Sequence, residues 1–367
     1  MKILLIQLTG RGGIQLYTAC LANALVKTED VYVLIGDNLI KKNYYNDNVK
    51  LIPIQSPISY YKMILLSLNP LTYYRIIKII NNLNPDIIHV TYEFLWDSIA
   101  LQFLKKYPII FTDHDPNQHV GTKAIVRLYI GISNKLIKNI SNKIIVHGNI
   151  LKKNLIEKGI SESKIQVIHL GDFSFYNKWQ DSSLIETKSI LFFGMIRDYK
   201  GLEYLIQAEP IITSSVPDTK IIIAGSGDFK KYDNLIINRK SFEIINRYIA
   251  DEEVANLFQK CSVVVLPYIE ASQSGVISIA YAFKKPVVTT NVGSIPEIVD
   301  DGITGFIVQP KDTLALSNAI IKLLQDEKLR KTLGENAYKK ATIELSWNNI
   351  CKKIIALYKD IIHNADS

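Results

Sequence analysis

The chain of 367 residues is 48% hydrophobic and 21% charged, with a formal net charge of +8. This composition excludes a disordered or fibrous chain, and the length suffices for two globular domains. There is no run of about 20 apolar residues, and the apolar start at residues 2–8 is too short for a secretory signal. The three cysteines lie far apart without paired spacing, which is typical of a reducing cytoplasm and predicts no structural metal.

Strands and helices are expected to alternate through the first half of the chain. Helical periodicity at residues 16–26 and 71–83 separates short apolar runs that are typical of buried strands. Continuous apolar strands joined by helical crossovers indicate a parallel sheet covered by helices on both faces. The predicted strands span residues 2–8, 31–36, 49–54, 86–90, 108–114, 143–148 and 164–171.

A polar stretch at residues 176–188 interrupts this pattern and is predicted to be a linker. The alternation of apolar runs and helical segments then restarts. The sequence therefore favours an α/β protein with two doubly wound, Rossmann-like parallel-sheet domains that face each other across a cleft. Helices at residues 312–326, 327–345 and 347–363 are expected to end the chain.

The positive charge is concentrated in the first half of the chain. Residues 1–186 contain 21 Lys and Arg against 14 Asp and Glu, and residues 103–158 alone contain 10 against 3. Such a patch attracts anions, which include nucleic acid, anionic lipid and phosphorylated substrates, although a merely solvated surface is the alternative. We expect no nucleic-acid partner, because no recognised recognition motif accompanies the patch.

Four loops follow predicted strands and open predicted helices, which is where open parallel sheets bind ligands and where free N–H groups suit phosphate. In the first loop, Gly10, Gly12 and Gly13 permit positive φ and close approach of the backbone. A simple turn is the alternative. The loop lacks both the P-loop lysine and the full dinucleotide-binding glycine pattern, which disfavours an NAD-dependent enzyme.

Two basic residues mark the second loop, at residues 192–201. Arg197 can hold a diphosphate with two parallel N–H groups, and Lys200 adds a point charge. Cations at the start of a helix oppose its dipole, so this placement favours an anionic ligand over simple solvation.

The third loop, SQSGV, is polar and leads into an otherwise apolar helix. Ser272 or Ser274 is expected to cap this helix with its hydroxyl group. Gly275 would let a phosphate oxygen approach the N–H groups of Gly275 and Val276, while the helix body packs in the core. A capping turn without a ligand is the alternative.

The fourth loop, FTDHDPNQH, places His114 at the end of a predicted strand, with Asp113 and Asp115 beside it. This position favours a functional histidine over a structural one. His119 and His147 are weaker candidates. The alternate residues of an extended D-H-D segment point to opposite faces, so we expect no metal site.

Five segments of the second half stand in a fixed order: FFGMIRDYKGLEYLIQA, IIIAGSGD, RYIADEEVANLFQKCSVVVLPY, PVVTTNVGSIPEIVDDGITGFIV and SWNNI. Together they resemble the retaining nucleotide-sugar glycosyltransferases of the GT-B fold, the group 1 or family 4 enzymes. The resemblance is strong over residues 186–350 and looser in the first half, through GRGG, TDHD and VIHLGD.

The resemblance implies an acceptor-binding domain of residues 1–175 with residues 347–367 as a returning C-terminal helix, and a nucleotide-sugar-binding domain of residues 187–346. It also implies roles for single residues. Arg197 and Lys200 would hold the donor diphosphate together with the backbone at Ser274, Gly275 and Val276, Gly12 and Gly13 would approach the same phosphates, Tyr248 and Ile249 would lie beside the base, and His114 would contact the donor sugar.

The sequence departs from the family at one point. Members usually carry two glutamates with seven residues between them, the second of which binds the ribose, and here those positions hold Ala271 and Ile279. Glu270 lies one residue early and has no partner at that spacing. The loop is similar to an SQSGV-type subset that lacks the same glutamates, so the difference does not imply an inactive protein.

The family resemblance implies transfer of a sugar from a nucleotide diphosphate sugar to a glycan or lipid-linked acceptor, with retention, in cell-surface polysaccharide biosynthesis. We expect no cofactor beyond this co-substrate and no metal. No carboxylate is placed to act as nucleophile, so His114, Arg197 and Lys200 are the candidate catalytic residues and the leaving diphosphate would help to take the acceptor proton. A sugar-nucleotide epimerase of GT-B type and a catalytically silent binding subunit are the alternatives.

A cytoplasmic enzyme with a peripheral place on the inner face of the membrane is expected. Residues 119–140 place four Lys and Arg among aliphatic residues, and residues 59–66 add aromatic and apolar side chains. Both segments could lie on an anionic bilayer, although ordinary packing helices are the alternative.

Overall fold

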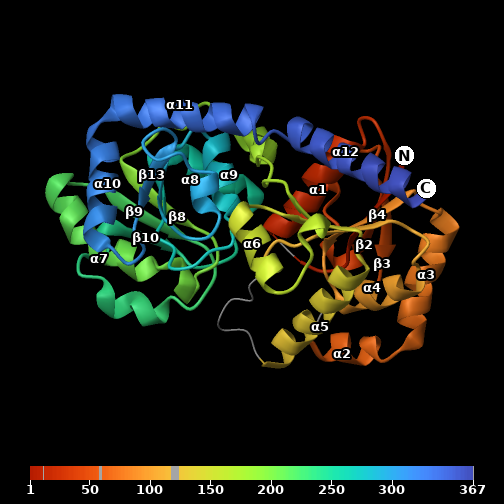
Figure 1. Ribbon diagram of the computed structural model, residues 1–367. Coiled ribbons are helices and arrows are strands. Elements are labelled where there is room, and N and C mark those ends of the chain that lie inside the picture. The colour runs from red at the N-terminus through yellow and green to blue at the C-terminus, as the bar shows by residue number, and fades with distance from the viewer. Residues whose placement is uncertain (11, 58–59, 117–123, 367) are drawn as a thin grey trace. The chain divides into compact units, whose positions relative to one another are not determined.

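The apolar runs of the two halves of the chain form two separate parallel sheets in the computed structural model (Figure 1). The structure describes residues 1–10, 12–57, 60–116 and 124–366. Two units result: unit 1 comprises Met1–His169 with Trp347–Ser367, and unit 2 comprises Leu170–Ser346. No helix of the described residues is long and apolar enough to cross a membrane.

Unit 1 contains a seven-stranded sheet in the order β3-β2-β1-β4-β5-β6-β7, in which all pairs are parallel. Because β1 and β4 are neighbours, the strand order reverses between them, which makes this the switch point of the sheet. The strands are β1 (Lys2–Gln7), β2 (Asp30–Gly36), β3 (Lys50–Ile54), β4 (Ile87–Tyr92), β5 (Ile109–Thr112), β6 (Lys143–Val146) and β7 (Ile165–Val167). The helices are α1 (Gly13–Leu25), α2 (Tyr60–Ser67), α3 (Pro70–Leu83), α4 (Leu95–Ala100), α5 (Ala124–Ile140), α6 (Asn149–Glu157) and α12 (Trp347–Asp366).

Helices cover both faces of this sheet, as the apolar strands predict. One face packs against α3, α4, α5 and α6 in a continuous apolar core. On the other face, α12 lies alongside α1 (Figure 1), and a buried polar layer joins helices and sheet. In that layer His89 of β4 contacts the Tyr358 hydroxyl of α12 at 2.6 Å and the Thr112 hydroxyl of β5 at 2.7 Å. The C-terminal helix therefore belongs to unit 1, as expected.

Unit 2 contains a six-stranded parallel sheet in the order β10-β9-β8-β11-β12-β13, with its switch point between β8 and β11. Apolar residues of α7 and α10 form a core against one face. The strands are β8 (Ser189–Phe193), β9 (Lys220–Ala224), β10 (Phe242–Ile245), β11 (Val263–Leu266), β12 (Val287–Thr290) and β13 (Gly305–Val308). The helices are α7 (Leu202–Ser215), α8 (Asp251–Lys260), α9 (Gly275–Ala282), α10 (Thr313–Gln325) and α11 (Glu327–Ile343).

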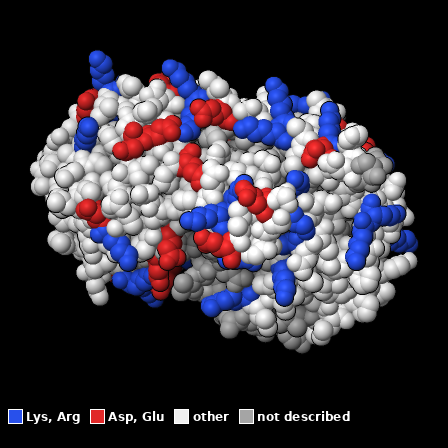
Figure 2. All heavy atoms as spheres, viewed as in Figure 1, with Lys and Arg blue, Asp and Glu red and all other residues white. Residues whose placement is uncertain are grey.

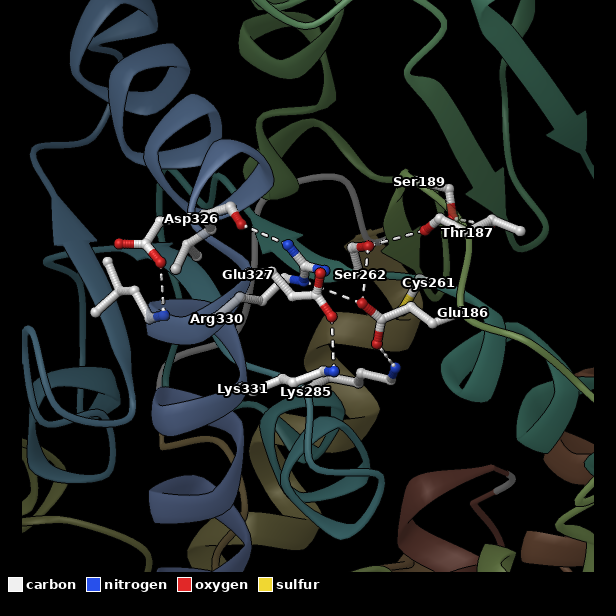
Figure 3. A network of polar contacts seen from close by, with 12 residues as sticks. Glu186, Thr187, Ser189, Cys261, Ser262, Lys285, Asp326, Glu327, Arg330 and Lys331 are labelled. Atoms are coloured by element: carbon white, nitrogen blue, oxygen red, sulfur yellow. Dashed lines mark hydrogen bonds and ion pairs between the residues drawn. The ribbon is translucent and has the colours of Figure 1, made fainter.

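An ion-pair network closes the amino-terminal edge of the unit 2 sheet (Figure 3). Glu186, which precedes β8, accepts from Lys285 before β12 at 2.5 Å and from Arg330 of α11 at 3.0 Å. Ser262, directly before β11, donates to the same carboxylate at 3.1 Å and to the Thr187 carbonyl at 2.8 Å. The network thus ties three strand starts to one helix, and its polar groups bind one another.

The segment between the two sheets is not a free linker, contrary to the prediction for residues 176–188. Residues Ser174–Trp179 form a 3₁₀ helix within unit 2, where Tyr176 is buried and Phe175 and Trp179 pack at a ring distance of 5.3 Å. The boundary also falls after His169 and not after residue 175. The reason is that residues 170–175 pack in unit 2: the Asp172 N–H donates to the Leu345 carbonyl at 2.8 Å.

Candidate functional site

The carboxyl edge of the unit 2 sheet carries the two basic residues that the sequence singled out. Arg197 and Lys200 lie in the connection from β8 to α7, next to the switch point. The Arg197 side chain is exposed and binds none of the described residues. Lys200 is partly buried, with its Nζ 3.5 Å from the Tyr268 hydroxyl. The edge therefore presents one guanidinium group without a partner and one ammonium group held in place.

The N-terminus of α9 lies beyond β11, across the same switch point. Ser274 is the N-cap residue, but its hydroxyl does not cap the helix, so the capping prediction is wrong for this serine. Its Oγ is 3.1 Å from the hydroxyl of Tyr268, the residue that also contacts Lys200. The Ser274 hydroxyl contacts Tyr268 and does not bind the start of the helix. The N–H groups of the partly buried residues Gly275 and Val276 therefore have no partner among the described residues.

Gly275 is required by packing within unit 2. A Cβ atom at this position would lie 2.8 Å from the Phe173 ring. We expected its small size to admit a phosphate oxygen, and the space beside its Cα is instead occupied by that ring. The N–H groups at the start of α9 remain the part of this loop that can bind an anion.

Three further residues of unit 2 lie at the same edge. Tyr248 and Ile249 follow β10; the Tyr248 side chain is 62% exposed, whereas Ile249 is buried and could meet a base only through its backbone. Glu270 is exposed and its carboxylate has no partner among the described residues. At the family's usual glutamate position, Ile279 is buried in α9, which explains why an apolar residue is stable there.

In unit 1, the N-terminus of α1 lies beyond β1 at the switch point of the sheet. Gly12 is the N-cap residue, with φ of 66° and no side-chain cap. This φ strongly favours glycine. A Cβ atom at Gly12 or Gly13 would meet no atom of the described residues within 4 Å, so no described side chain packs against either glycine at that point. The loop has the geometry of an anion site on a helix N-terminus.

His114 follows β5 and is buried, and both of its ring nitrogens have partners. Its Nε2 lies 2.9 Å from the Thr91 carbonyl oxygen, and its Nδ1 lies 3.0 Å from Nε2 of His147. Tyr17 of α1 packs against the ring edge-on at 4.6 Å between centroids. Burial, with the neighbouring His147, holds the pKa of His114 well below its usual value. A direct hydrogen bond from His114 to a ligand would therefore have to replace an internal one.

The sequence undervalued His147, which turns out to be the direct partner of His114. It follows β6, the strand next to β5, and its Nδ1 lies 2.9 Å from the Ile168 carbonyl oxygen. Burial lowers the pKa of His147 to about 4. Its place at the carboxyl end of a neighbouring strand was the signal in the sequence that could have raised its weight.

Glu93 is a second residue that the sequence analysis missed. It follows β4 at the switch point of unit 1 and accepts from the Asn134 amide at 2.9 Å. Burial and the charge of Asp113 raise the pKa of Glu93 to about 8. Asp113 itself pairs with Lys138 at 2.6 Å. At neutral pH Glu93 is therefore largely a neutral acid that can donate a hydrogen bond.

Two expectations concern metals and His119. The described residues contain no group of three or more His, Cys, Asp and Glu side chains placed to hold a metal ion. His119 lies outside the described residues.

Two family models match the chain, and each of them covers one of the two sheets. Residues 176–340 match the family of glycosyl transferases group 1, and residues 11–171 match glycosyltransferase family 4. The capsular polysaccharide biosynthesis glycosyltransferase CapM of Staphylococcus aureus is 26% identical over 365 residues, which is 93% of this chain and 92% of CapM.

Solved structures share the fold over nearly the whole chain. Sucrose-phosphate synthase from Thermosynechococcus elongatus superposes with a TM-score of 0.76 at 19% identity, covering 99% of both chains. The Anabaena protein HepE, solved in complex with UDP-glucose, gives a TM-score of 0.76 at 20% identity and covers 98% of this chain and 100% of its own. At these identities the likeness establishes the two-sheet GT-B fold.

Proposed function

Since the chain belongs to the group 1, family 4 glycosyltransferases, a family of retaining enzymes that use nucleotide sugars, we propose that it transfers a sugar from a nucleoside diphosphate sugar to a glycan or lipid-linked acceptor. The observation that carries this proposal is the switch point of unit 2. There a guanidinium group without a partner, the Lys200 ammonium group and the uncapped N-terminus of α9 lie at one edge of one sheet.

These groups suit a diphosphate leaving group. Negative charge builds on the diphosphate as the glycosidic bond breaks, and preorganised donors that meet this charge supply a large part of the rate. Arg197 would bind two oxygens at once, Lys200 would add a fixed charge, and the Gly275 and Val276 N–H groups would complete the site. Within unit 1, the N–H groups at Gly12 and Gly13 would bind phosphate in the same way.

The remaining donor contacts follow the family by position. Tyr248 is exposed enough to pack against a base, with Ile249 contributing its backbone. His114 would lie near the donor sugar. With retention implied by the family and no carboxylate nucleophile identified, the departing diphosphate would help to accept the proton of the acceptor hydroxyl.

Capsule or other cell-surface polysaccharide synthesis is the proposed process, by similarity to CapM, whose name places it there. The solved HepE complex makes UDP-glucose a first donor to test. The decisive experiment is a thermal-shift panel of nucleoside diphosphate sugars, because a ligand that binds only the folded state raises the melting temperature. The best donor then enters a transfer assay with lipid-linked and soluble glycans.

The outcomes of these assays separate the proposed transferase from its alternatives. Transfer that requires an acceptor supports the proposal. Conversion of the donor without an acceptor would identify an epimerase, and donor binding without turnover would identify a silent binding subunit. A panel in which no nucleotide raises the melting temperature would contradict the proposal.

A peripheral place on an anionic membrane is also proposed, on the basis of unit 1. Two apolar side chains of α5, Leu128 and Ile132, are 64% and 45% exposed, and the exposed Arg127 and Lys135 lie on the same side of the helix. Basic side chains predominate over acidic ones on the face of unit 1 seen in Figure 2. Apolar side chains flanked by cations are the pattern of a helix that rests on anionic lipid.

We therefore predict that the double variant Arg127→Glu with Lys135→Glu lowers flotation with anionic liposomes at low salt. Each cation near such a surface contributes about 1 kcal/mol, so reversing two of them should cut binding at least tenfold. The matched control is Lys328→Glu with Lys339→Glu on α11 of unit 2, both exposed. Equal flotation of the two double variants, or no binding of the unchanged protein, would contradict the prediction.

A further inference from the structure

The two histidines of unit 1 contact each other in a row of hydrogen bonds that needs more hydrogens than two neutral rings carry. Four groups form a row: the Thr91 carbonyl oxygen, the His114 ring, the His147 ring and the Ile168 carbonyl oxygen. The row contains three contacts, of 2.9, 3.0 and 2.9 Å, and each needs one hydrogen. A carbonyl oxygen only accepts, so the hydrogens must come from the rings.

Two neutral imidazoles supply only two hydrogens. If these serve the two carbonyl oxygens, as N–H on Nε2 of His114 and on Nδ1 of His147, then two lone pairs face each other across 3.0 Å. If either ring carries its hydrogen on its other nitrogen, the contact between the rings gains a hydrogen, but one of the two carbonyl contacts then lacks one. One additional proton on the pair satisfies all three contacts at once, so the geometry is complete only for the singly protonated pair.

The surroundings of the pair oppose a charge in the absence of ligand. Among the described residues, the titratable groups that face it are Tyr17 from α1, His89 from β4 and His169 after β7, and none of these is a carboxyl group. The carboxyl groups on its own and the adjoining strand ends are Asp113, which pairs with Lys138, Asp115 and Glu93. Neither histidine forms an ion pair with a described carboxylate, so burial favours the neutral pair.

We propose that His147 is a positioning residue, which holds His114 through one shared proton that the pair takes up when an anionic donor binds. The inference rests on the proposed function, since the diphosphate would supply a negative charge for the pair that no described carboxylate provides. The proton comes from solvent, enters the space between His114 Nδ1 and His147 Nε2, and fixes Nε2–H of His114 on Thr91. His114 would then act on the donor by its charge and its ring edge.

Two substitutions of His147 form a matched pair. In His147→Gln the side-chain amide nitrogen reaches the place of Nε2 and can donate to His114 Nδ1 at every pH. In His147→Asn the amide nitrogen lies near the place of Nδ1, where it can serve the Ile168 carbonyl but not His114. Both are neutral and polar, so they differ mainly in the contact that the inference concerns.

The test begins with ¹⁵N nuclear magnetic resonance of the histidine rings, without ligand, between pH 8 and pH 4. We expect the nitrogens at the His114–His147 contact to shift together with one midpoint and one bound proton, a coupled titration. This joint step should vanish in His147→Gln. Independent midpoints for the two rings would overturn the inference whether or not the protein is a transferase.

Inorganic pyrophosphate then tests the link to the donor, because it carries the diphosphate charge without a choice of base. We expect the joint midpoint to rise by about three pH units, the upper end for an ionisable group that gains an opposite charge nearby, because the pKa values of both rings start well below neutrality. In the transfer assay, His147→Asn should lose about tenfold more kcat/KM than His147→Gln, and both variants should lose the joint titration of the pair. A joint midpoint that pyrophosphate leaves unmoved would count against donor binding near His114, and equal activities of the two variants would count against His147 as a positioning residue.

Discussion

Arg197→Ala is expected to lower the turnover of sugar transfer about 100-fold or more. The side chain is exposed and has no partner among the described residues, so its loss should leave folding nearly unchanged. Its proposed task is to meet the charge that builds on the leaving diphosphate, and removal of one preorganised donor of this kind costs about 100- to 1,000-fold. The measurement is a radiolabelled transfer assay at saturating donor.

Arg239→Ala is the matched control for this substitution. Arg239 is also an exposed arginine of unit 2 whose side chain binds none of the described residues, but it lies before β10, at the amino-terminal edge of the sheet. We expect its turnover to stay within about twofold of the unchanged protein, since surface substitutions away from a site have small effects. An Arg197→Ala enzyme that retains near-normal turnover would refute the proposed role of the switch point.

Of the substitutions that we propose, Glu186→Gln should lower the free energy of unfolding most. The substitution removes the only carboxylate that Figure 3 shows between Lys285 and Arg330, whose side chains are 7% and 11% exposed. Breaking a buried ion pair from one side leaves uncompensated buried charge. Because Glu186 itself is 33% exposed, solvent offsets part of that cost. We expect a loss of about 2–3 kcal/mol, which is less than the roughly 3–5 kcal/mol for a fully buried pair because of this exposure.

Calorimetry of the full chain measures this effect. For a unit of this size the melting temperature of the affected transition should fall by about 4–12 °C. The control is Glu327→Gln, which breaks the neighbouring exposed pair with Lys331 in the same figure, and which should change stability by less than about 0.5 kcal/mol. Similar shifts for the two variants would show that the network contributes no more than a surface pair.

Much of the fold follows from local patterns in the sequence. Apolar runs of five to eight residues between helical segments predicted parallel sheets, since strand and helix periodicity depend on neighbouring residues. The same patterns placed Arg197, Lys200 and His114 directly after strands, and the structure places all three at carboxyl edges. Their roles toward a donor stay predictions.

Local patterns failed at two places where a side-chain contact outside the strand and helix pattern decides the structure. Residues 176–188 looked polar enough for a linker, but Tyr176 and its aromatic neighbours pack within unit 2. Ser274 had the residue type of a cap, and yet the Tyr268 hydroxyl, from the preceding loop, takes its Oγ. In both cases a tertiary contact overrides a sound local preference.

The sequence by itself determined the class of fold, the order of the elements and the loops in which charged residues and glycines occur, because these depend on neighbours along the chain. Only the tertiary structure decided which of these residues meet. His114 and His147 are 33 residues apart, and Glu186 and Lys285 are 99 apart. They come together because parallel strands with crossover helices bring equivalent ends of distant strands to one edge, and residue spacing alone carries no record of that strand order.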